Sequence, residues 1–275
     1  MKAVCDICPR HCCIPEGGTG ACRARKNENG RIVCSNYGMI SSLALDPIEK
    51  KPLKRFRPGS MILSAGSCGC NLSCPFCQNH EISMVSCDDI SAEYFSPADL
   101  CDAAVSMRSR GNIGIAYTYN EPLVSYEYIL DCSEKIKKAG LANVLVTNGY
   151  VCKEPLERLL PDIDAMNIDL KGFTQRFYDM VGGDLETVKN TIVSAVESCH
   201  VEVTFLVIPE ENDSTEEMSR LSSWLASLNR SIPLHVSKFF PRYKMSGRIA
   251  TPTEKIYELA DIAQKRLKYV YTGNC

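Results

Sequence analysis

The segment AGSCGCNLSCPFCQNHE, residues 65–81, places four cysteines within ten positions. Three of them, Cys70, Cys74 and Cys77, follow a C-x3-C-x2-C spacing, and Cys68 stands just before them. Thiolates bind zinc or iron–sulfur clusters, and a closed structural zinc site takes four protein ligands. Three regularly spaced cysteines in one loop leave a coordination position open, which is typical of a reactive site rather than a structural one. Cys68 is the competing candidate for a fourth ligand.

Around this segment the sequence alternates between strand and helix patterns. Apolar strands are expected at 61–67, 114–119, 143–147, 164–170, 201–208, 233–239 and 269–272. Helices are expected at 97–110, 123–138, 154–160, 185–199, 213–229 and 253–267. This alternation predicts βαβ units with a parallel sheet and right-handed crossovers, so that helices cover the outside. Six such units favour a partial or full barrel, although the pattern alone also allows a doubly wound sheet.

Polar residues follow the predicted strands, at the edge where both architectures build their sites. The cysteine loop follows the first strand, and the segments NEP (120–122) and TNG (147–149) follow the next two. Asp169 and Lys171 close the fourth strand, and His235 lies within the sixth. Each alone could be a turn residue, since Asn-Gly is a turn signal. Their common placement favours a shared site.

The first part of the chain holds a second group of cysteines. Cys5, Cys8, Cys12 and Cys22 give a C-x2-C-x3-C-x9-C spacing that suits zinc or a second iron–sulfur cluster, with free or packed thiols as the alternative. Spacing does not decide between zinc and a cluster. Cys13 and Cys34 are weaker candidates.

Two regions are expected from this distribution. Residues 1–58 show little helix or strand pattern and form a cysteine-rich segment, in which a metal would stabilise what a small core cannot. Residues 59–275 form the barrel. The glycine-rich segment EGGTG, residues 16–20, would let the chain return Cys22 to the other three cysteines.

Composition limits the classes of function. The chain has 275 residues, a formal net charge of −2 and sixteen cysteines. The near-neutral charge gives no reason to expect a nucleic-acid or membrane surface, and no apolar run approaches the roughly 20 residues of a membrane helix. The first residues show no signal-peptide pattern. We therefore expect a cytoplasmic protein in which the cysteines serve metal or redox chemistry rather than a disulfide framework.

The segment GCNLSCPFCQN resembles the cluster loop of radical S-adenosylmethionine (SAM) enzymes, with Phe76 before the last cysteine. Further segments, including CDICPRHCC, DPIEKKPLKRFRPGS, YTYNEPL, VTNGYV, NIDLKGF and PLHVSKFFPRYKM, extend the resemblance over nearly the whole chain. Together they are similar to a branch near pyruvate formate-lyase activating enzymes, the AmmeMemoRadiSam-system radical SAM proteins. The resemblance implies an α/β fold, a partial (β/α)6 TIM-like barrel with an irregular cysteine-rich N-terminal extension.

The resemblance also implies a cofactor chemistry. Cys70, Cys74 and Cys77 would bind three irons of a [4Fe–4S] cluster, and the fourth iron would take the amino and carboxylate groups of SAM. One electron, from a donor such as flavodoxin or ferredoxin, would cleave SAM to methionine and a 5′-deoxyadenosyl radical. This radical would abstract hydrogen from an unidentified substrate. Cys68 lies outside the family motif and is interpreted as a non-ligand.

Contacts with SAM are implied for residues that match the family's positions. These are Asn120 and Glu121 for the amino group, and Thr147, Asn148, Asp169, Lys171 and His235 for the ribose and carboxylate. Two departures stand out. Val146 replaces an aspartate that helps the activating enzymes to hold a monovalent cation. Lys54-Arg55 replaces an aromatic-His pair and either favours an acidic substrate or is a solvated charged stretch.

Three functions remain open from the sequence. The first is a radical SAM oxidoreductase acting on an unidentified substrate. The second is an activase that forms a radical on a glycine of a protein substrate, for which the barrel mouth should admit a peptide loop. The third is a zinc-stabilised binding scaffold without catalysis.

Overall fold

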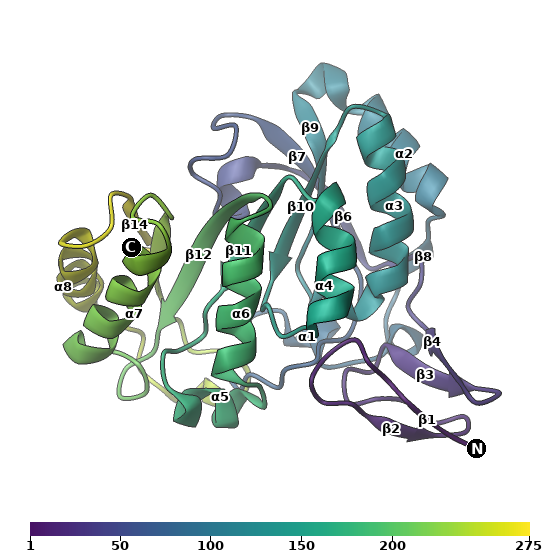
Figure 1. The fold of residues 1–275 in the computed structure, drawn as a ribbon, viewed down its shortest axis with the longest axis horizontal. Coiled ribbons are helices and arrows are strands. Elements are labelled where there is room, and N and C mark those ends of the chain that lie inside the picture. The colour runs from purple at the N-terminus through teal and green to yellow at the C-terminus, as the bar shows by residue number, and fades with distance from the viewer.

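The computed structural model describes residues 1–275 and is built around one eight-stranded sheet (Figure 1). The strand order is β14-β13-β12-β11-β10-β9-β7-β6, and every neighbouring pair is parallel except β6 and β7. The strands are β6 (Ser42–Pro47), β7 (Met61–Gly66), β9 (Asn112–Tyr117), β10 (Ala142–Thr147), β11 (Ala165–Asp169), β12 (His200–Val207), β13 (Leu234–Lys238) and β14 (Val270–Gly273). The predicted parallel βαβ architecture is confirmed, as a partial barrel whose end strands are β6 and β14.

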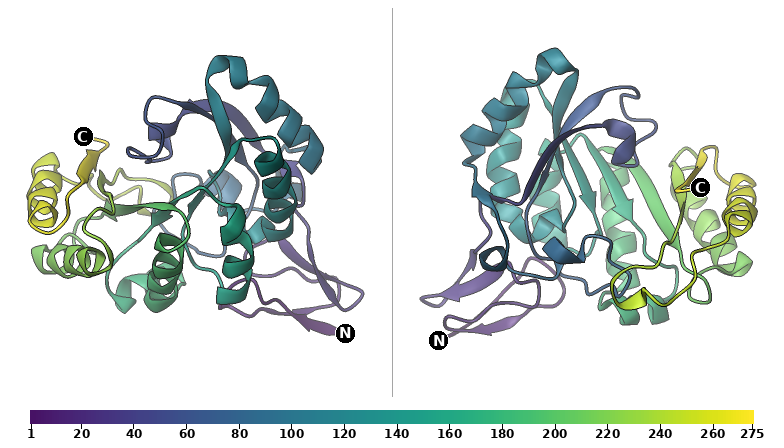
Figure 2. Two further views of the ribbon diagram at one scale, coloured as in Figure 1. Left: turned by 45° about the horizontal axis from the view of Figure 1, so that its top comes forward. Right: turned by 180° about the vertical axis from the view of Figure 1, so that it is seen from behind.

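The structure has eight helices, most of which lie on the outer, convex face of the curved sheet (Figure 2). They are α1 (His80–Ser83), α2 (Pro97–Ser106), α3 (Tyr126–Lys138), α4 (Lys153–Leu159), α5 (Gln175–Val181), α6 (Leu185–Val196), α7 (Thr215–Leu228) and α8 (Thr253–Gln264). Short 3-10 turns are η1 (Ile48–Lys50), η2 (Cys87–Asp89), η3 (Arg108–Arg110), η4 (Pro122–Ser125), η5 (Leu160–Asp162) and η6 (Tyr243–Met245). None of the helices is long and apolar enough to cross a membrane.

Side-chain caps set the helix boundaries that the sequence predicts. Ser96 Oγ accepts a hydrogen bond from Asp99 N at 3.2 Å, and Asp99 Oδ2 accepts one from Ser96 N at 2.9 Å, which forms a capping box at the start of α2. Gly111 ends this region with a φ of +83°, which glycine adopts readily. For α7 the cap is Ser214, whose side chain accepts from Glu217 N.

The N-terminal extension consists of turns and short two-stranded ribbons. β1 (Lys2–Val4) pairs with β2 (Cys13–Pro15), β3 (Arg25–Glu28) with β4 (Arg31–Cys34), and β5 (Met39–Ile40) with β8 (Glu93–Tyr94). β6, which follows them, joins the barrel sheet by pairing antiparallel with β7. The division near residue 58 stays a prediction, and part of the first region shares the sheet of the second.

The chain between β6 and β7 lies on the concave side of the sheet (Figure 2). Ile48 and Leu53 are fully buried against strand residues, and Asn167 Nδ2 donates to Pro52 O at 2.9 Å. Next to them the fully buried carboxylate of Glu202 accepts from Lys54 N at 3.0 Å and from Arg55 N at 2.6 Å. This segment therefore fills the interior of the barrel below the carboxyl ends of the strands.

Two histidines complete the surroundings of Glu202. His200 Nε2 lies 3.0 Å from Oε1, and His235 Nε2 lies 2.6 Å from Oε2. Burial alone would raise the pKa of Glu202, but the hydrogen bonds from both histidines and from the two backbone N–H groups outweigh it and lower the pKa to about 2. Glu202 is therefore ionised in the folded protein and ties the segment at 54–55 to β12 and β13.

We expect Glu202→Gln to destabilise the protein by up to about 3 kcal/mol at pH 7, because the pKa falls from 4.5 to about 2 at roughly 1.36 kcal/mol per unit. A carboxylate whose pKa is lower in the folded than in the unfolded protein stabilises the fold at pH values above its unfolded pKa. The difference between wild type and variant should therefore shrink as the pH falls from 4.5 towards 2. Urea unfolding at pH 7 and at pH 3 measures it.

Glu186→Gln is the matched control, since Glu186 is 67% exposed and pairs only with Lys189 on the surface of α6. Its effect should stay below about 1 kcal/mol. A Glu202→Gln protein that is as stable as wild type at pH 7, or equally destabilised at both pH values, would contradict the assignment.

Candidate functional site

A cavity of about 400 Å³ opens at the carboxyl ends of the barrel strands. The residues that line it follow β7, β9, β10 and β11, with contributions from β12, β13 and the chain end. Nine of the predicted site residues line it together: Cys70, Cys74, Cys77, Asn120, Glu121, Thr147, Asn148, Asp169 and Lys171. Right-handed parallel crossovers bring these ends to one edge, as the sequence predicts.

The cysteine loop enters this cavity directly after β7. Asn148 Nδ2 lies 3.6 Å from Cys70 Sγ, within range of a weak N–H···S hydrogen bond. Burial raises the pKa of Cys74 to about 12, and the positive charge of Lys171 acts in the opposite direction. Metal binding requires the thiolate, and it displaces the proton from such a cysteine. The loop thus offers three thiols, one of them beside a cation, to a thiophilic metal group.

Glu121 joins the ends of two strands beneath this loop. Its carboxylate is buried and accepts hydrogen bonds from Leu123 N at 3.0 Å, Thr147 Oγ1 at 2.6 Å and Asn148 N at 2.8 Å. Burial raises the pKa of Glu121 to about 7, while these hydrogen bonds lower it. A buried carboxylate without a cationic partner is a site where a positively charged ligand would be stabilised.

Asp169 and Lys171 form an ion pair at the end of the neighbouring strand β11, with Nζ and Oδ2 separated by 2.6 Å. Burial would lower the pKa of Lys171, but the negative charge of Asp169 and the nearby cysteines outweigh it, so the pKa is raised. The lysine is therefore a permanent cation close to Cys74. It can offset the negative charge of thiolates or bind a ligand carboxylate.

The side chain of Asn120 forms hydrogen bonds with the cysteine loop. Oδ1 accepts from Ser67 N at 2.9 Å, and Nδ2 donates to Cys68 O at 2.9 Å and to Gly69 O at 3.1 Å. The amide therefore fixes the start of the loop. Its predicted contact with the SAM amino group stays a prediction, and the observed bonds give the residue a positioning role.

His235 does not line the cavity, and its predicted contact with SAM stays a prediction. It lies at the second residue of β13, and its Nε2 is bonded to Glu202. Ser237, two residues further along the same strand face, lines the cavity instead. The sequence shows that His235 belongs to an inward-facing strand, but its depth in the barrel depends on the strand register.

Lys54 and Arg55 are exposed and do not line the cavity, which favours a solvated charged stretch over a role toward an acidic substrate. Their N–H groups bind Glu202, and the Arg55 guanidinium stacks over the Tyr269 ring at 4.2 Å. Besides Lys171, two further lysines line the cavity, Lys50 and Lys51, which sequence reasoning missed. Val146 does line it, so no carboxylate stands at that position.

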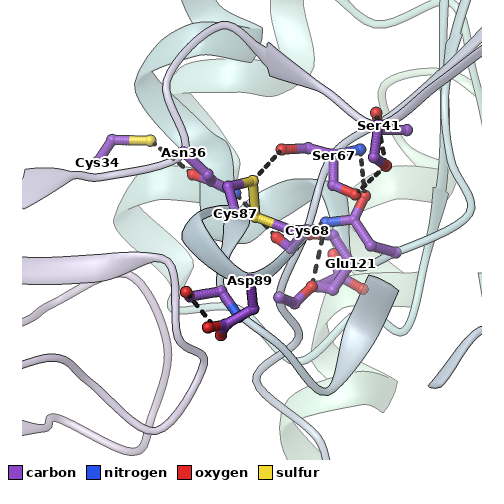
Figure 3. Close-up of a disulfide and its surroundings, with 12 residues drawn as sticks. Cys34, Asn36, Ser41, Ser67, Cys68, Cys87, Asp89 and Glu121 are labelled. Atoms are coloured by element: carbon purple, nitrogen blue, oxygen red, sulfur yellow. Dashed lines mark hydrogen bonds between the residues drawn. A yellow bond between two sulfur atoms is a disulfide. The ribbon is translucent and has the colours of Figure 1, made fainter. Parts of the chain in front are cut away.

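Cys68 forms a disulfide with Cys87, with the Cα atoms 5.5 Å apart (Figure 3). Cys87 belongs to η2, and Ser67 Oγ lies 3.8 Å from its sulfur. The bond engages the sulfur of Cys68, which supports the interpretation of this residue as a non-ligand. The separation of 19 residues between the two cysteines does not predict a disulfide. Their approach depends on the turn that the chain makes at α1.

The four predicted N-terminal ligands, Cys5, Cys8, Cys12 and Cys22, line one small cavity. Burial raises the pKa of Cys8 to about 11. Cys13 is exposed, and Cys34 does not line the cavity. No group of three or more His, Cys, Asp or Glu side chains in the structure is arranged so that it could hold a metal ion. The thiols of a cluster each bind a different iron, whereas zinc would gather four sulfurs at about 2.3 Å.

The extension contacts the cysteine loop through its backbone. Cys70 N donates to Cys22 O at 3.1 Å, and Arg10 Nε donates to Asn71 O at 2.7 Å. Gly69 permits the approach, because it has a φ of +82° and a Cβ at this position would lie 2.4 Å from Cys22 O. The two groups of cysteines are thus neighbours in space, on opposite sides of one backbone contact.

Comparisons with known proteins agree with this geometry. A family model described as the Radical SAM superfamily matches residues 66–221. An uncharacterized protein of Methanocaldococcus jannaschii is 41% identical over 276 residues, across 99% of this chain and 81% of that protein. The pyruvate formate-lyase-activating enzyme of Clostridium pasteurianum is 24% identical over 163 residues, across 58% of this chain and 67% of the enzyme.

A solved structure shows the same fold. A domain of a pyruvate-formate lyase-activating enzyme from Bacteroides vulgatus aligns with a TM-score of 0.51 and 18% identity, over 58% of this chain and 99% of that domain. The match to the family model spans more than half of the chain and includes the cysteine loop and the polar residues after β9, β10 and β11. The chain therefore belongs to the radical SAM superfamily, whose fold implies a [4Fe–4S] cluster and SAM.

Proposed function

We propose that this protein is a radical SAM enzyme whose cluster is held by Cys70, Cys74 and Cys77. The observation that carries the proposal is that these three thiols line the same cavity as Glu121, Asp169 and Lys171. When bound, the cluster would supply the electron that cleaves SAM to a 5′-deoxyadenosyl radical, and this radical would abstract hydrogen from the substrate. The chain is then an oxidoreductase in the broad sense, and its residues position the reactants and exclude water.

The charged residues of the cavity would interact with oppositely charged groups of SAM. The buried carboxylate of Glu121 would attract the ammonium or sulfonium charge, and Lys171 would attract the carboxylate. The N–H of Asn148 near Cys70 Sγ would stabilise thiolate charge and so influence the reduction potential of the cluster. Thr147 orients Glu121 through its hydroxyl. Glu121 and Lys171 thus keep the parts of SAM that the sequence predicts for them, whereas contacts of Thr147, Asn148, Asp169 and His235 with the ribose and carboxylate stay predictions.

The size of the cavity limits the substrate. About 400 Å³ lies at the lower end of the range of roughly 300–1,000 Å³ for small-molecule sites. SAM would take a large part of this volume, so only a small molecule or a small part of a larger one can reach the reactive centre. This supports a small-molecule substrate over a wide peptide-binding mouth.

An activase that acts on a protein glycine is the alternative, supported by the distant similarity to a pyruvate formate-lyase-activating enzyme. Such an enzyme would leave a glycyl radical on its partner, which electron paramagnetic resonance detects. A flavodoxin or ferredoxin would be the electron donor in either case, and a cytoplasmic location would suit both such a donor and an oxygen-sensitive cluster. A zinc scaffold without catalysis is the remaining alternative.

We also propose a second metal centre on Cys5, Cys8, Cys12 and Cys22. The shared cavity of the four thiols supports it, as does the small size of the extension, which has little core of its own. Zinc and an iron–sulfur cluster are both compatible with four cysteines. In either case the centre would hold the backbone of Cys22 against Cys70 and so stabilise the cluster loop.

Anaerobic reconstitution with iron and sulfide should give a brown protein that forms methionine and 5′-deoxyadenosine when dithionite and SAM are added. Cys74→Ala should lose both the cluster absorbance and deoxyadenosine formation, because it removes a thiolate ligand. Visible absorbance, iron analysis and chromatography of the products measure these outcomes.

Cys68→Ala and Cys87→Ala are the matched controls in the same region, and both should keep the cluster. Loss of iron in the Cys68→Ala protein would overturn the ligand assignment. A colourless wild-type protein that contains zinc, no iron and no deoxyadenosine activity would support the scaffold instead.

The second centre predicts metal beyond the cluster. Reconstituted wild type should contain either zinc or more iron than one [4Fe–4S] cluster, and the double variant Cys5→Ala/Cys22→Ala should lose this excess and melt at a lower temperature. Cys13→Ala, which changes the exposed neighbour, should keep it. Equal metal content in wild type and the double variant would refute the centre.

A further inference from the structure

The cavity has a second charged end that the cofactor residues do not account for. Lys50 and Lys51 line it where the chain leaves η1, across from Asp169 and Lys171. Lys51 is only 3% exposed, and its ammonium lies 2.9 Å from Asp46 Oδ2 and 3.4 Å from the Tyr119 hydroxyl. A lysine this buried normally has a full set of partners.

Lys51 lacks one of these partners. An ammonium has three N–H donors. Asp46 and the Tyr119 hydroxyl accept two of them, and the third has no oxygen or nitrogen acceptor, although the centroid of the Tyr119 ring lies 4.4 Å from Nζ. The Tyr119 hydroxyl donates in turn to Asp46 Oδ2 at 2.7 Å. Burial lowers the pKa of Lys51, while Asp46 raises it, so its charged form would gain from a further acceptor. The remaining donor belongs to a side chain that lines the cavity.

The charges at this end do not cancel. Lys50 Nζ lies 3.5 Å from Asp46 Oδ1, so two lysines share one carboxylate. Hydrogen bonds from Lys51 and Tyr119 outweigh burial and lower the pKa of Asp46 to about 2, which keeps it ionised. The surplus is one positive charge. At the end of β11 Lys171 is matched by Asp169 and is assigned to the SAM carboxylate, so the Lys50–Lys51 end is the place left for a further anionic group.

Tyr119, which lies beside Lys51 in the cavity, has a strained backbone conformation. Its φ is +72°, which non-glycine residues rarely adopt and which tends to occur at functional sites. Its carbonyl accepts from Asn79 Nδ2 at 2.7 Å, and a Cβ on Gly66 would lie 2.7 Å from its ring. Gly66 is the last residue of β7, so the Tyr119 ring packs against the chain just before the cysteine loop, and Tyr119 lines the same cavity.

We propose that Lys51, Lys50 and Tyr119 form a subsite for a carboxylate group of the substrate. One surplus charge matches a carboxylate, whereas a phosphate monoester carries about −1.5 to −2 and would exceed it. The free N–H of Lys51 binds the carboxylate, and Lys50 adds attraction from the more exposed side. This inference rests on the proposed function and names the substrate class: a small molecule with a carboxylate on the side of the cavity away from Asp169.

The test measures binding of acetate, with acetamide as its uncharged isostere, to the reconstituted holoenzyme by ligand-observed nuclear magnetic resonance at fixed ionic strength. Wild type should bind acetate and show no comparable binding of acetamide. Lys51→Met should weaken acetate binding by at least about tenfold, because it removes a charged hydrogen-bond donor. Lys54→Met, a lysine of the same segment that lies outside the cavity, should leave acetate binding unchanged.

A second variant and further ligands complete the binding test. If Lys51→Met does not fold, as judged by circular dichroism and iron content, Lys50→Met replaces it, since Lys50 is 67% exposed; it should weaken acetate binding by a smaller factor. Three outcomes would each overturn the proposal. They are equal binding of acetate by wild type and both lysine variants, binding of acetamide by wild type as tight as that of acetate, and binding of inorganic phosphate much tighter than that of acetate. Acetate binding that depends on Lys51 without deoxyadenosine formation would refute the proposed activity and leave the subsite standing.

Discussion

The buried carboxylate of Glu121 is the interaction on which the arrangement of the site depends. It accepts from Leu123, Thr147 and Asn148, and so fixes the chain after β9 to the chain after β10. Asn148 then reaches Cys70 and Asn71 with its amide. A carboxylate in so little solvent costs stability unless donors surround it, and this requirement holds the loops of neighbouring strands in one geometry.

The N-terminal extension supports the same loop from the other side. The contact between Cys70 N and Cys22 O exists because Gly69 has no side chain, and Arg10 adds a bond to Asn71 O. The segment after β6 fills the interior of the barrel and carries Lys50 and Lys51 to the cavity. A region with little regular pattern in its sequence therefore forms both a support for the cluster loop and one end of the cavity.

Most of the fold could be predicted, because its signals are local. Strand lengths, the capping box at Ser96 and the stop at Gly111 depend on residues a few positions apart. The common edge of Cys70, Glu121, Asn148 and Asp169 follows from parallel connectivity alone. The positions of His235 and of the Lys54-Arg55 pair, none of which lines the cavity, depend instead on how deep each residue lies in the barrel. That depth comes from strand register and from the path of an irregular segment, neither of which the hydrophobic pattern specifies.

The sequence by itself determined the three-cysteine loop, the parallel barrel and the polar residues at the strand ends, since spacing and periodicity encode them directly. Only the tertiary structure decided the partner of Cys68, the gathering of Cys5, Cys8, Cys12 and Cys22, and the lysines that face the cavity. These arrangements depend on the path of irregular segments, which carry no periodic pattern. Their geometry follows from how the extension packs on the barrel, which no local pattern contains.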